Sequence, residues 1–201
     1  VNNAITRMRL VSLAMLEDAI ESLIEDDDVL AQDVIERDDD VDRLWYMVSR
    51  VFRTVLRNPT AANEIGLSRD DAFDFQSSAR QLERIADHTT KIAELALDVG
   101  EIPDNAAAPL EDLLAETRDV PDKAMDALLE DDPDEAVELA NEARACIQDV
   151  DEKALEVDKE VHEFDPQVAQ VLGLVVDSLS RTADYGGNIA ESALQKAAPR
   201  P

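Results

Sequence analysis

The chain carries one helical motif twice, and this repeat limits its possible folds more than any other feature. Residues 82–94 read LERIADHTTKIAE and residues 179–191 read LSRTADYGGNIAE. The two copies are 97 residues apart, counted from Leu82 to Leu179, and they stay in register through Leu97 and Leu194. In both copies apolar residues recur every three or four positions, as on one face of a helix. Unrelated amphipathic helices rarely keep Arg, Asp and Glu in the same places, so we interpret the repeat as an internal duplication.

Composition predicts an all-α fold. Hydrophobic residues make up 45 % of the 201 residues, but aromatics are only 3 % and there are five glycines. Leu, Ala, Val and Ile must therefore form the core, and this mixture favours helices over sheets. Apolar periodicity and turn signals predict six antiparallel helices, at about 3–26, 29–56, 68–99, 109–129, 134–163 and 166–197. With the duplication, we expect two three-helix bundles, residues 1–100 and 104–197, which together form one unit.

Prolines divide the predicted helices. Asn58-Pro59 should end the second helix, because proline disfavours helix at the residue before it, and we expect a loop from there to about Leu67. Pro121 lies inside the fourth predicted helix, where it should kink the helix or break it in two. Pro199 and Pro201 are expected to mark a frayed end.

The charge of the chain is strongly unbalanced. There are 47 acidic residues against 19 basic ones, and the net charge is −28. Such self-repulsion is best tolerated where salt screens it, so the acidic surface with few lysines is typical of a high-salt cytoplasm, as in halophilic archaea. No basic patch is visible, so we expect no direct nucleic-acid binding by these residues. No apolar run approaches the roughly 18 residues of a membrane span and no signal peptide is evident, so we expect a soluble, cytoplasmic protein without membrane insertion.

Two pairs of acidic residues are candidates for a metal site. Asp38 and Asp42 stand four apart in the second predicted helix, and Glu83 and Asp87 stand four apart in the third. Each pair therefore lies on one helix face, and antiparallel packing would bring the two pairs together. Four close carboxylates repel one another unless protons or cations lie among them. Oxygen-rich clusters suit manganese, iron, magnesium or calcium, and also zinc where a histidine joins.

A plainer interpretation of these four acids stays open at this point. They could be solvated, or they could pair with the arginines that lie nearby in the sequence, which are Arg37, Arg43, Arg80 and Arg84. Acidic residues at this spacing also arise easily by chance in so acidic a chain.

The residues quoted above resemble a known family. LERIADHTTKIAE at residues 82–94 looks like the signature helix of the PhoU family of phosphate-uptake regulators, and residues 38–42 (DDDVD) resemble its E/DxxxD motif. The resemblance implies a duplicated three-helix bundle over essentially the whole chain. It also implies a metal cluster of iron, zinc or manganese on Asp38, Asp42, Glu83 and Asp87. The implied function is to restrain the phosphate-specific ABC transporter, through its ATPase, and its sensor kinase when phosphate is plentiful. That role involves no catalysis, and a homodimer is expected.

The second half departs from the family pattern. Aligning Ile147 with Val34 places Asp151 opposite the first ligand, and Asp184 keeps the position of the last. Leu155 and Ser180 replace the other two ligands. We therefore expect one full metal site, in the first half, and a weaker or empty one in the second.

Two other function classes were weighed. The chain could be the regulatory domain of a larger transcription regulator or ion-transport system, which a basic or β-rich segment ahead of Val1 would indicate. A carboxylate-bridged metalloenzyme of the ferritin-like kind typically has a histidine three residues after a glutamate. Neither His88 nor His162 has a glutamate three residues before it, so the sequence argues against this enzyme class.

Overall fold

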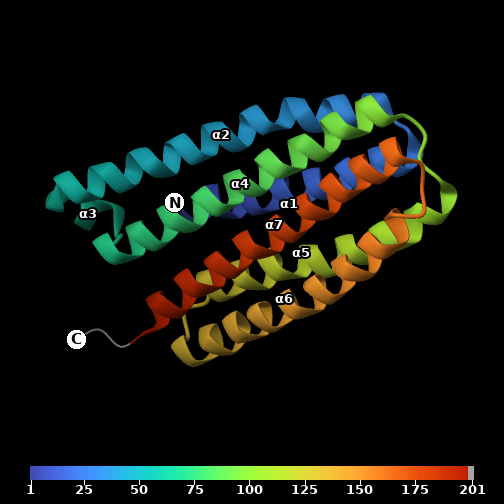
Figure 1. The fold of residues 1–201 in the computed structure, drawn as a ribbon. Coiled ribbons are helices and arrows are strands. Elements are labelled where there is room, and N and C mark those ends of the chain that lie inside the picture. Colours follow the sequence, from blue (N-terminus) through green and yellow to red (C-terminus); the bar gives the residue numbers. More distant parts are fainter. Residues whose placement is uncertain (199–201) are drawn as a thin grey trace.

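The computed structural model describes residues 1–198, which form an elongated bundle of long helices (Figure 1). Within this range there is no strand, which confirms the predicted all-α class. No helix in this part of the chain is long and apolar enough to cross a lipid bilayer. Pro199 and Pro201 lie outside the described residues. The helices are α1 (Asn2–Glu25), α2 (Asp28–Arg57), α3 (Pro59–Ile65), α4 (Arg69–Val99), the 3-10 turn η1 (Asp104–Ala106), α5 (Ala107–Leu129), α6 (Pro133–Val161) and α7 (Pro166–Ala197).

Local side-chain chemistry sets most helix ends where the sequence predicts them. The side chain of Ser68 accepts a hydrogen bond from the backbone N–H of Asp71 at the start of α4. Asp132 and Asp165 cap α6 and α7 in the same way, each followed by a proline at the first helical position. These side chains satisfy N–H groups that have no partner within the helix, which fixes where each helix begins.

The predicted count of six helices is wrong, because residues 59–65 form the short helix α3 instead of a loop. Asn58 and Pro59 do end α2, but the same pair also starts a helix. The Asn58 side chain accepts hydrogen bonds from the backbone N–H groups of Thr60 and Ala61, and Pro59 suits the first turn. Gly66 then ends α3 in a left-handed conformation with φ 70°.

The predicted break at Pro121 is also absent, since α5 runs without interruption through that residue. Proline removes one N–H···O=C bond, which would normally weaken the helix. Here α7 packs directly onto the same turn. A Cβ atom built on Gly186 of α7 would lie only 2.7 Å from the Pro121 nitrogen. Tertiary packing at this close approach supports the helical backbone.

The helices pack in two groups of three. Helices α1, α2 and α4 contact one another, and α5, α6 and α7 contact one another (Figure 1). The groups are joined chiefly along α4 and α7, with a smaller contact between α1 and α5. One continuous cluster of buried apolar side chains draws on both groups, so the two halves share a core.

Equivalent residues of the repeated motif meet where α4 and α7 cross. His88 and Tyr185 are 97 positions apart, as are the two copies of the motif, and their ring centroids lie 5.6 Å apart. Asn188 of α7 donates a hydrogen bond of 3.2 Å to Gln81 of α4, and Arg84 stacks over the Tyr185 ring. Contacts that run forward along α4 and backward along α7 make the junction antiparallel. The pairing of equivalent residues gives it approximate twofold symmetry.

Candidate functional site

The structure brings the four predicted acids of the first half together along the contact between α2 and α4. Asp38 and Asp42 come from α2, and Glu83 and Asp87 come from α4, which packs directly against α2. Glu83 is buried, with only 7 % of its surface exposed, whereas Asp87 is exposed to solvent. The two pairs therefore line one seam that runs from the interior to the surface.

The pKa values of three of these acids show how strongly the seam opposes negative charge. Burial, followed by the charges of Asp87, Asp42 and Asp39, raises the pKa of Asp38 to about 6. Burial and then Asp87 raise the pKa of Asp42, and the same two causes raise that of Glu83. The charge of Asp87 thus acts on all three other acids. Carboxylates in such a setting bind protons or cations more readily than exposed ones do.

Arg80 is the basic group that the structure places in this seam. Its guanidinium donates to Glu83 Oε1 at 2.5 Å and lies 5.5 Å from the centre of the Trp45 ring. The other nearby arginines are engaged elsewhere. Arg37 pairs with Asp18 and Asp33, and Arg43 pairs with Asp39 and Asp40. Pairing with arginine, the plainer interpretation of the sequence, therefore holds for Glu83 and leaves most of the acidic seam uncompensated.

The seam fits a hard metal ion by donor chemistry but is not a formed coordination site. It offers carboxylate oxygens, and within residues 1–198 the buried Glu83 Oε2 accepts no hydrogen bond. However, no group of three or more His, Cys, Asp or Glu side chains in the described chain is arranged to hold a metal ion. The side chains would have to turn toward one another for a metal to bind.

The second half brings Asp151 and Asp184 together but surrounds them differently. Both line a surface pocket of about 660 Å³ between α6 and α7. Two arginines, Arg144 and Arg181, line the same pocket, and Arg181 lies 3.6 Å from Asp184. Positive charge therefore already stands where a cation would bind.

His88 does not join the acidic seam, although it follows Asp87 in the sequence. Its ring faces α7, where Nδ1 lies 3.3 Å from Ser178 Oγ and Nε2 lies 3.4 Å from the Tyr185 hydroxyl. Burial and then the charge of Lys91 lower the pKa of His88. His88 therefore packs as a neutral side chain at the junction of the two halves. The sequence did not reveal this role, because only the fold brings α7 alongside α4.

In metal-free protein, replacing Asp38 by asparagine is expected to stabilise the fold at pH 8 and to have no such effect at pH 4. The folded-state pKa of about 6 exceeds the ordinary value of 3.8, so the folded protein holds this proton more tightly than the unfolded chain. The stability that the proton contributes is present below pH 4 and is lost as the pH rises through about 6. Allowing for solvent screening, the gain at pH 8 should be about 1–2 kcal/mol, or roughly 3–6 °C in Tm.

The measurement is Tm against pH for the two proteins. Glu36→Gln is the matched control, because it removes the same charge from an exposed side chain of α2 that does not contribute to the raised pKa values of the seam. An equal gain for both variants at pH 8 would mean that general charge repulsion, and not the seam, causes the effect.

Comparisons with known proteins agree with the resemblance. Residues 5–96 match the family model described as the PhoU domain. The chain is 26 % identical over 182 residues to a protein of Pseudomonas aeruginosa named phosphate-specific transport system accessory protein PhoU homolog, covering 88 % of this chain and 73 % of that protein. A protein of the same name from Pseudomonas putida is 28 % identical and is covered over 69 % of its length.

Two solved structures share the fold over almost the whole chain. PhoU from Pseudomonas aeruginosa superposes with a TM-score of 0.79 at 25 % identity, over 96 % of this chain and 92 % of that one. The phosphate transport system regulatory protein PhoU from Streptococcus pneumoniae gives a TM-score of 0.76 at 17 % identity, which shows the fold alone, over 96 % and 90 %. The match of residues 5–96 to the PhoU domain model, the similarity to the two relatives and the common fold all agree with the resemblance to the PhoU family.

Proposed function

We propose that this protein is a regulatory accessory protein of a phosphate transport system. The observation that carries the proposal is its similarity over 88 % of its length to proteins named as accessory proteins of that system. In the expected role the protein restrains the transporter when phosphate is plentiful, by binding the transport ATPase, the sensor kinase or both. It acts by binding partners, as a homodimer and without catalysing a reaction.

Deleting the gene in its host tests this proposal. Uptake of labelled phosphate is expected to stay high in phosphate-rich medium, where the parent strain lowers it. The purified protein is also expected to bind the purified transport ATPase subunit or the sensor kinase of the same host. Normal repression of uptake in the deletion strain would contradict the proposal.

We further propose that the acidic seam of the first half binds a metal ion, with Asp38, Asp42, Glu83 and Asp87 as its ligands. Iron, zinc or manganese are the expected ions. The proposal is supported by the raised pKa values in the seam and by the unpartnered Glu83 Oε2. The bound ion would supply the positive charge that these carboxylates lack. Asp151 and Asp184 are proposed as a weaker site, because arginines share their pocket.

Elemental analysis of protein purified in high salt without chelator tests the metal site. Metal is expected in the native protein and should be lost in the double variant Asp42→Ala/Glu83→Ala. The matched control is Asp39→Ala/Asp40→Ala, which also removes two carboxylates from this region but from exposed positions. Native protein without metal above background would mean that the seam holds protons and Arg80 only.

The two halves, residues 1–100 and 104–197, are proposed to be copies of one three-helix unit. Support comes from the motif repeated at a spacing of 97 residues and from the contact between the equivalent residues His88 and Tyr185. A duplicated unit that packs against its own copy would bring equivalent positions together in this way.

A further inference from the structure

One end of this acidic molecule is locally basic. Residues 43–69 include the second half of α2, all of α3 and the first residue of α4. This segment contains five arginines and a single acidic residue, Glu64, in a chain with a net charge of −28. The segment therefore carries net positive charge and departs from the expectation that no basic patch is present, although Asp70 and Asp71 follow it directly.

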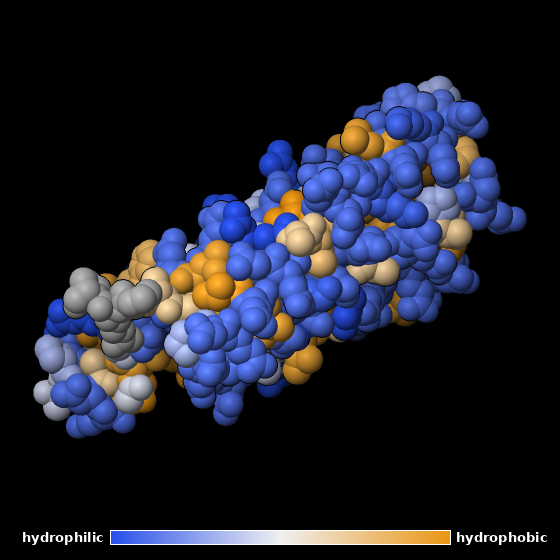
Figure 2. All heavy atoms as spheres, turned by 90° about the horizontal axis from the view of Figure 1, so that it is seen from below, coloured by the Kyte–Doolittle hydropathy of each residue, from blue (hydrophilic) through white to orange (hydrophobic). Residues whose placement is uncertain are grey.

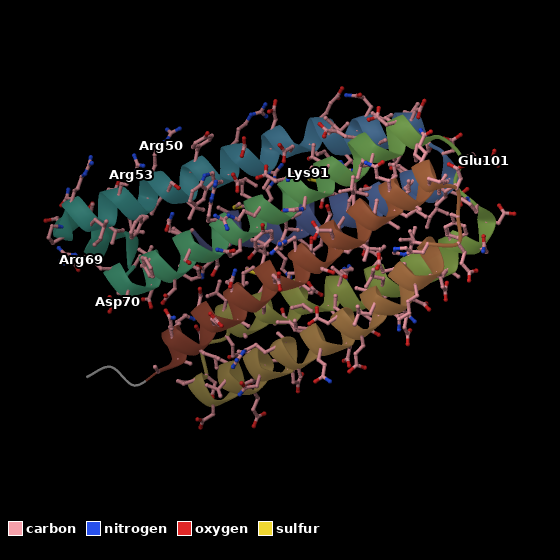
Figure 3. All side chains as sticks on the ribbon, viewed as in Figure 1. Arg50, Arg53, Arg69, Asp70, Lys91 and Glu101 are labelled. Atoms are coloured by element: carbon pink, nitrogen blue, oxygen red, sulfur yellow. The ribbon has the colours of Figure 1, made fainter. Side chains whose placement is uncertain are left out.

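Four of these arginines form no ion pair within the described part of the chain. Arg50, Arg53, Arg57 and Arg69 are exposed, and none of them forms an ion pair with any of residues 1–198. Figure 3 shows Arg50 and Arg53 projecting outward from α2, with Arg69 at the same end of the molecule. Arg9, in contrast, finds two carboxylates at close range, although Arg7 and Arg144 also form no ion pair within residues 1–198. The positive charge of this end is thus left for groups outside the chain.

An apolar hollow lies beside Arg50, one of these arginines. Met47, Arg50, Val51, Thr54 and Ile65 line a cavity of about 400 Å³ that is open to the surface between α2 and α3. The side chains of Met47 and Ile65 are 46 % and 48 % exposed. Figure 2 shows the side of the molecule opposite to α2, where hydrophilic side chains predominate and apolar ones appear in scattered patches. Exposed apolar side chains gathered at one place, with polar residues around them, are typical of a protein–protein contact.

We propose that this α2–α3 surface, made by the hollow and by Arg50, Arg53, Arg57 and Arg69, docks an acidic protein partner. The partner places an apolar side chain in the hollow and carboxylates against the arginines. Charge complementarity argues for this partner, because arginine forms its best contacts with carboxylates and is enriched at the centres of interfaces. The inference rests on the proposed accessory function, which requires a surface for a partner.

Other occupants fit this surface less well. A symmetric contact between two copies would place the same patch on both subunits, so that arginines would face arginines. A lipid surface or a nucleic acid could also meet these arginines with negative charge. Neither of them offers a protruding apolar side chain to fill a hollow, as a protein does.

Binding of a defined peptide to the full chain tests the surface. The probe is a fluorescein-labelled helical peptide with leucines on one face and glutamates beside them, and fluorescence anisotropy gives its Kd at low and at high salt. Arg50→Glu/Arg53→Glu and, separately, Ile65→Ser are each expected to raise Kd about tenfold or more. All three positions are exposed, so neither variant should impair folding. The matched control Arg144→Glu/Lys159→Glu changes charge equally at exposed positions on α6 and should alter Kd by less than about twofold.

Several results would overturn the proposal. These are no measurable binding of the peptide, equal weakening by the control, and equal affinity for a peptide with serines in place of the leucines. Tight binding of anionic lipid vesicles or duplex DNA that is lost in Arg50→Glu/Arg53→Glu would assign the surface to that polyanion instead. A binding measurement with the transport ATPase distinguishes a failure of this inference from a failure of the proposed function. If Arg50→Glu/Arg53→Glu binds the ATPase as well as the native protein does, the surface is wrong and the accessory function stands.

Discussion

Truncating either Leu82 or Leu179 to alanine is expected to lower the free energy of unfolding by about 2–5 kcal/mol. The two leucines are equivalent positions of the repeat, on α4 and α7, and neither is exposed to solvent. Both belong to the single apolar cluster that the two halves share. Each truncation removes buried surface and leaves a cavity in that cluster, so each should destabilise the whole molecule. Urea unfolding followed by circular dichroism measures the effect, and one cooperative transition is expected for both variants.

Leu155→Ala is the matched control, because Leu155 on α6 is 62 % exposed. Its effect should stay within about 0.5 kcal/mol. A different outcome would contradict the shared core. If Leu179→Ala splits unfolding into two steps, one at the native midpoint, residues 1–100 hold together without the second half.

Gly186→Ala is expected to have the second large effect. It should lower the free energy of unfolding by about 1–3 kcal/mol. The added Cβ would lie 2.7 Å from the backbone nitrogen of Pro121 and 3.0 Å from its Cα. Backbone atoms in the middle of a helix cannot turn aside as the end of a side chain can. The helices α5 and α7 would therefore have to move apart, which loosens the packing on both. Thermal unfolding of the variant measures the loss.

Two other glycines of α7 provide the controls. A Cβ at Gly187 would meet only the flexible Cδ1 atom of Ile147, at 2.8 Å, so Gly187→Ala should cost less than Gly186→Ala. Gly173 has nothing within 4 Å of the added atom. Gly173→Ala should therefore stabilise the protein by about 0.5–1 kcal/mol, since alanine favours helix over glycine. A loss at Gly173 as large as that at Gly186 would show that the close approach to Pro121 is not the cause.

Most of the fold could be predicted from the sequence because its signals are local. Apolar periodicity finds the long helices, and caps such as Ser68 and Asp165 fix where they start. The failures have a common physical reason. The sequence predicts Asn58-Pro59 only as the end of α2. The same pair also starts α3, because Asn can cap the start of a helix and Pro suits its first turn. Pro121 was expected to disturb its helix, but its effect depends on Gly186, which lies 65 residues away in the sequence and touches it in the fold.

The sequence predicts which residues make up the candidate site, but not the burial and the charges that surround them. Spacing four apart places Asp38 with Asp42 and Glu83 with Asp87 on single helix faces. The direct packing of α2 on α4 then brings the pairs together. Spacing also allows the pair that forms, since Arg80 and Glu83 stand three apart on α4, and Arg43 likewise stands three from Asp40 on α2. Only the packing of α1 against α2 shows that Arg37 reaches Asp18.

By itself the sequence determined the helical class, the repeat at 97 residues and the acidic motifs, because these depend on residue types and on spacings along a single helix. The tertiary structure alone decided how residues distant in sequence combine. It turned His88 toward α7 and away from the acids, and it allowed α5 to continue through Pro121. Among residues 1–198 it also left four arginines without an ion pair near an apolar hollow. Burial and the charges of neighbouring helices set these properties, and both exist only once the helices have packed.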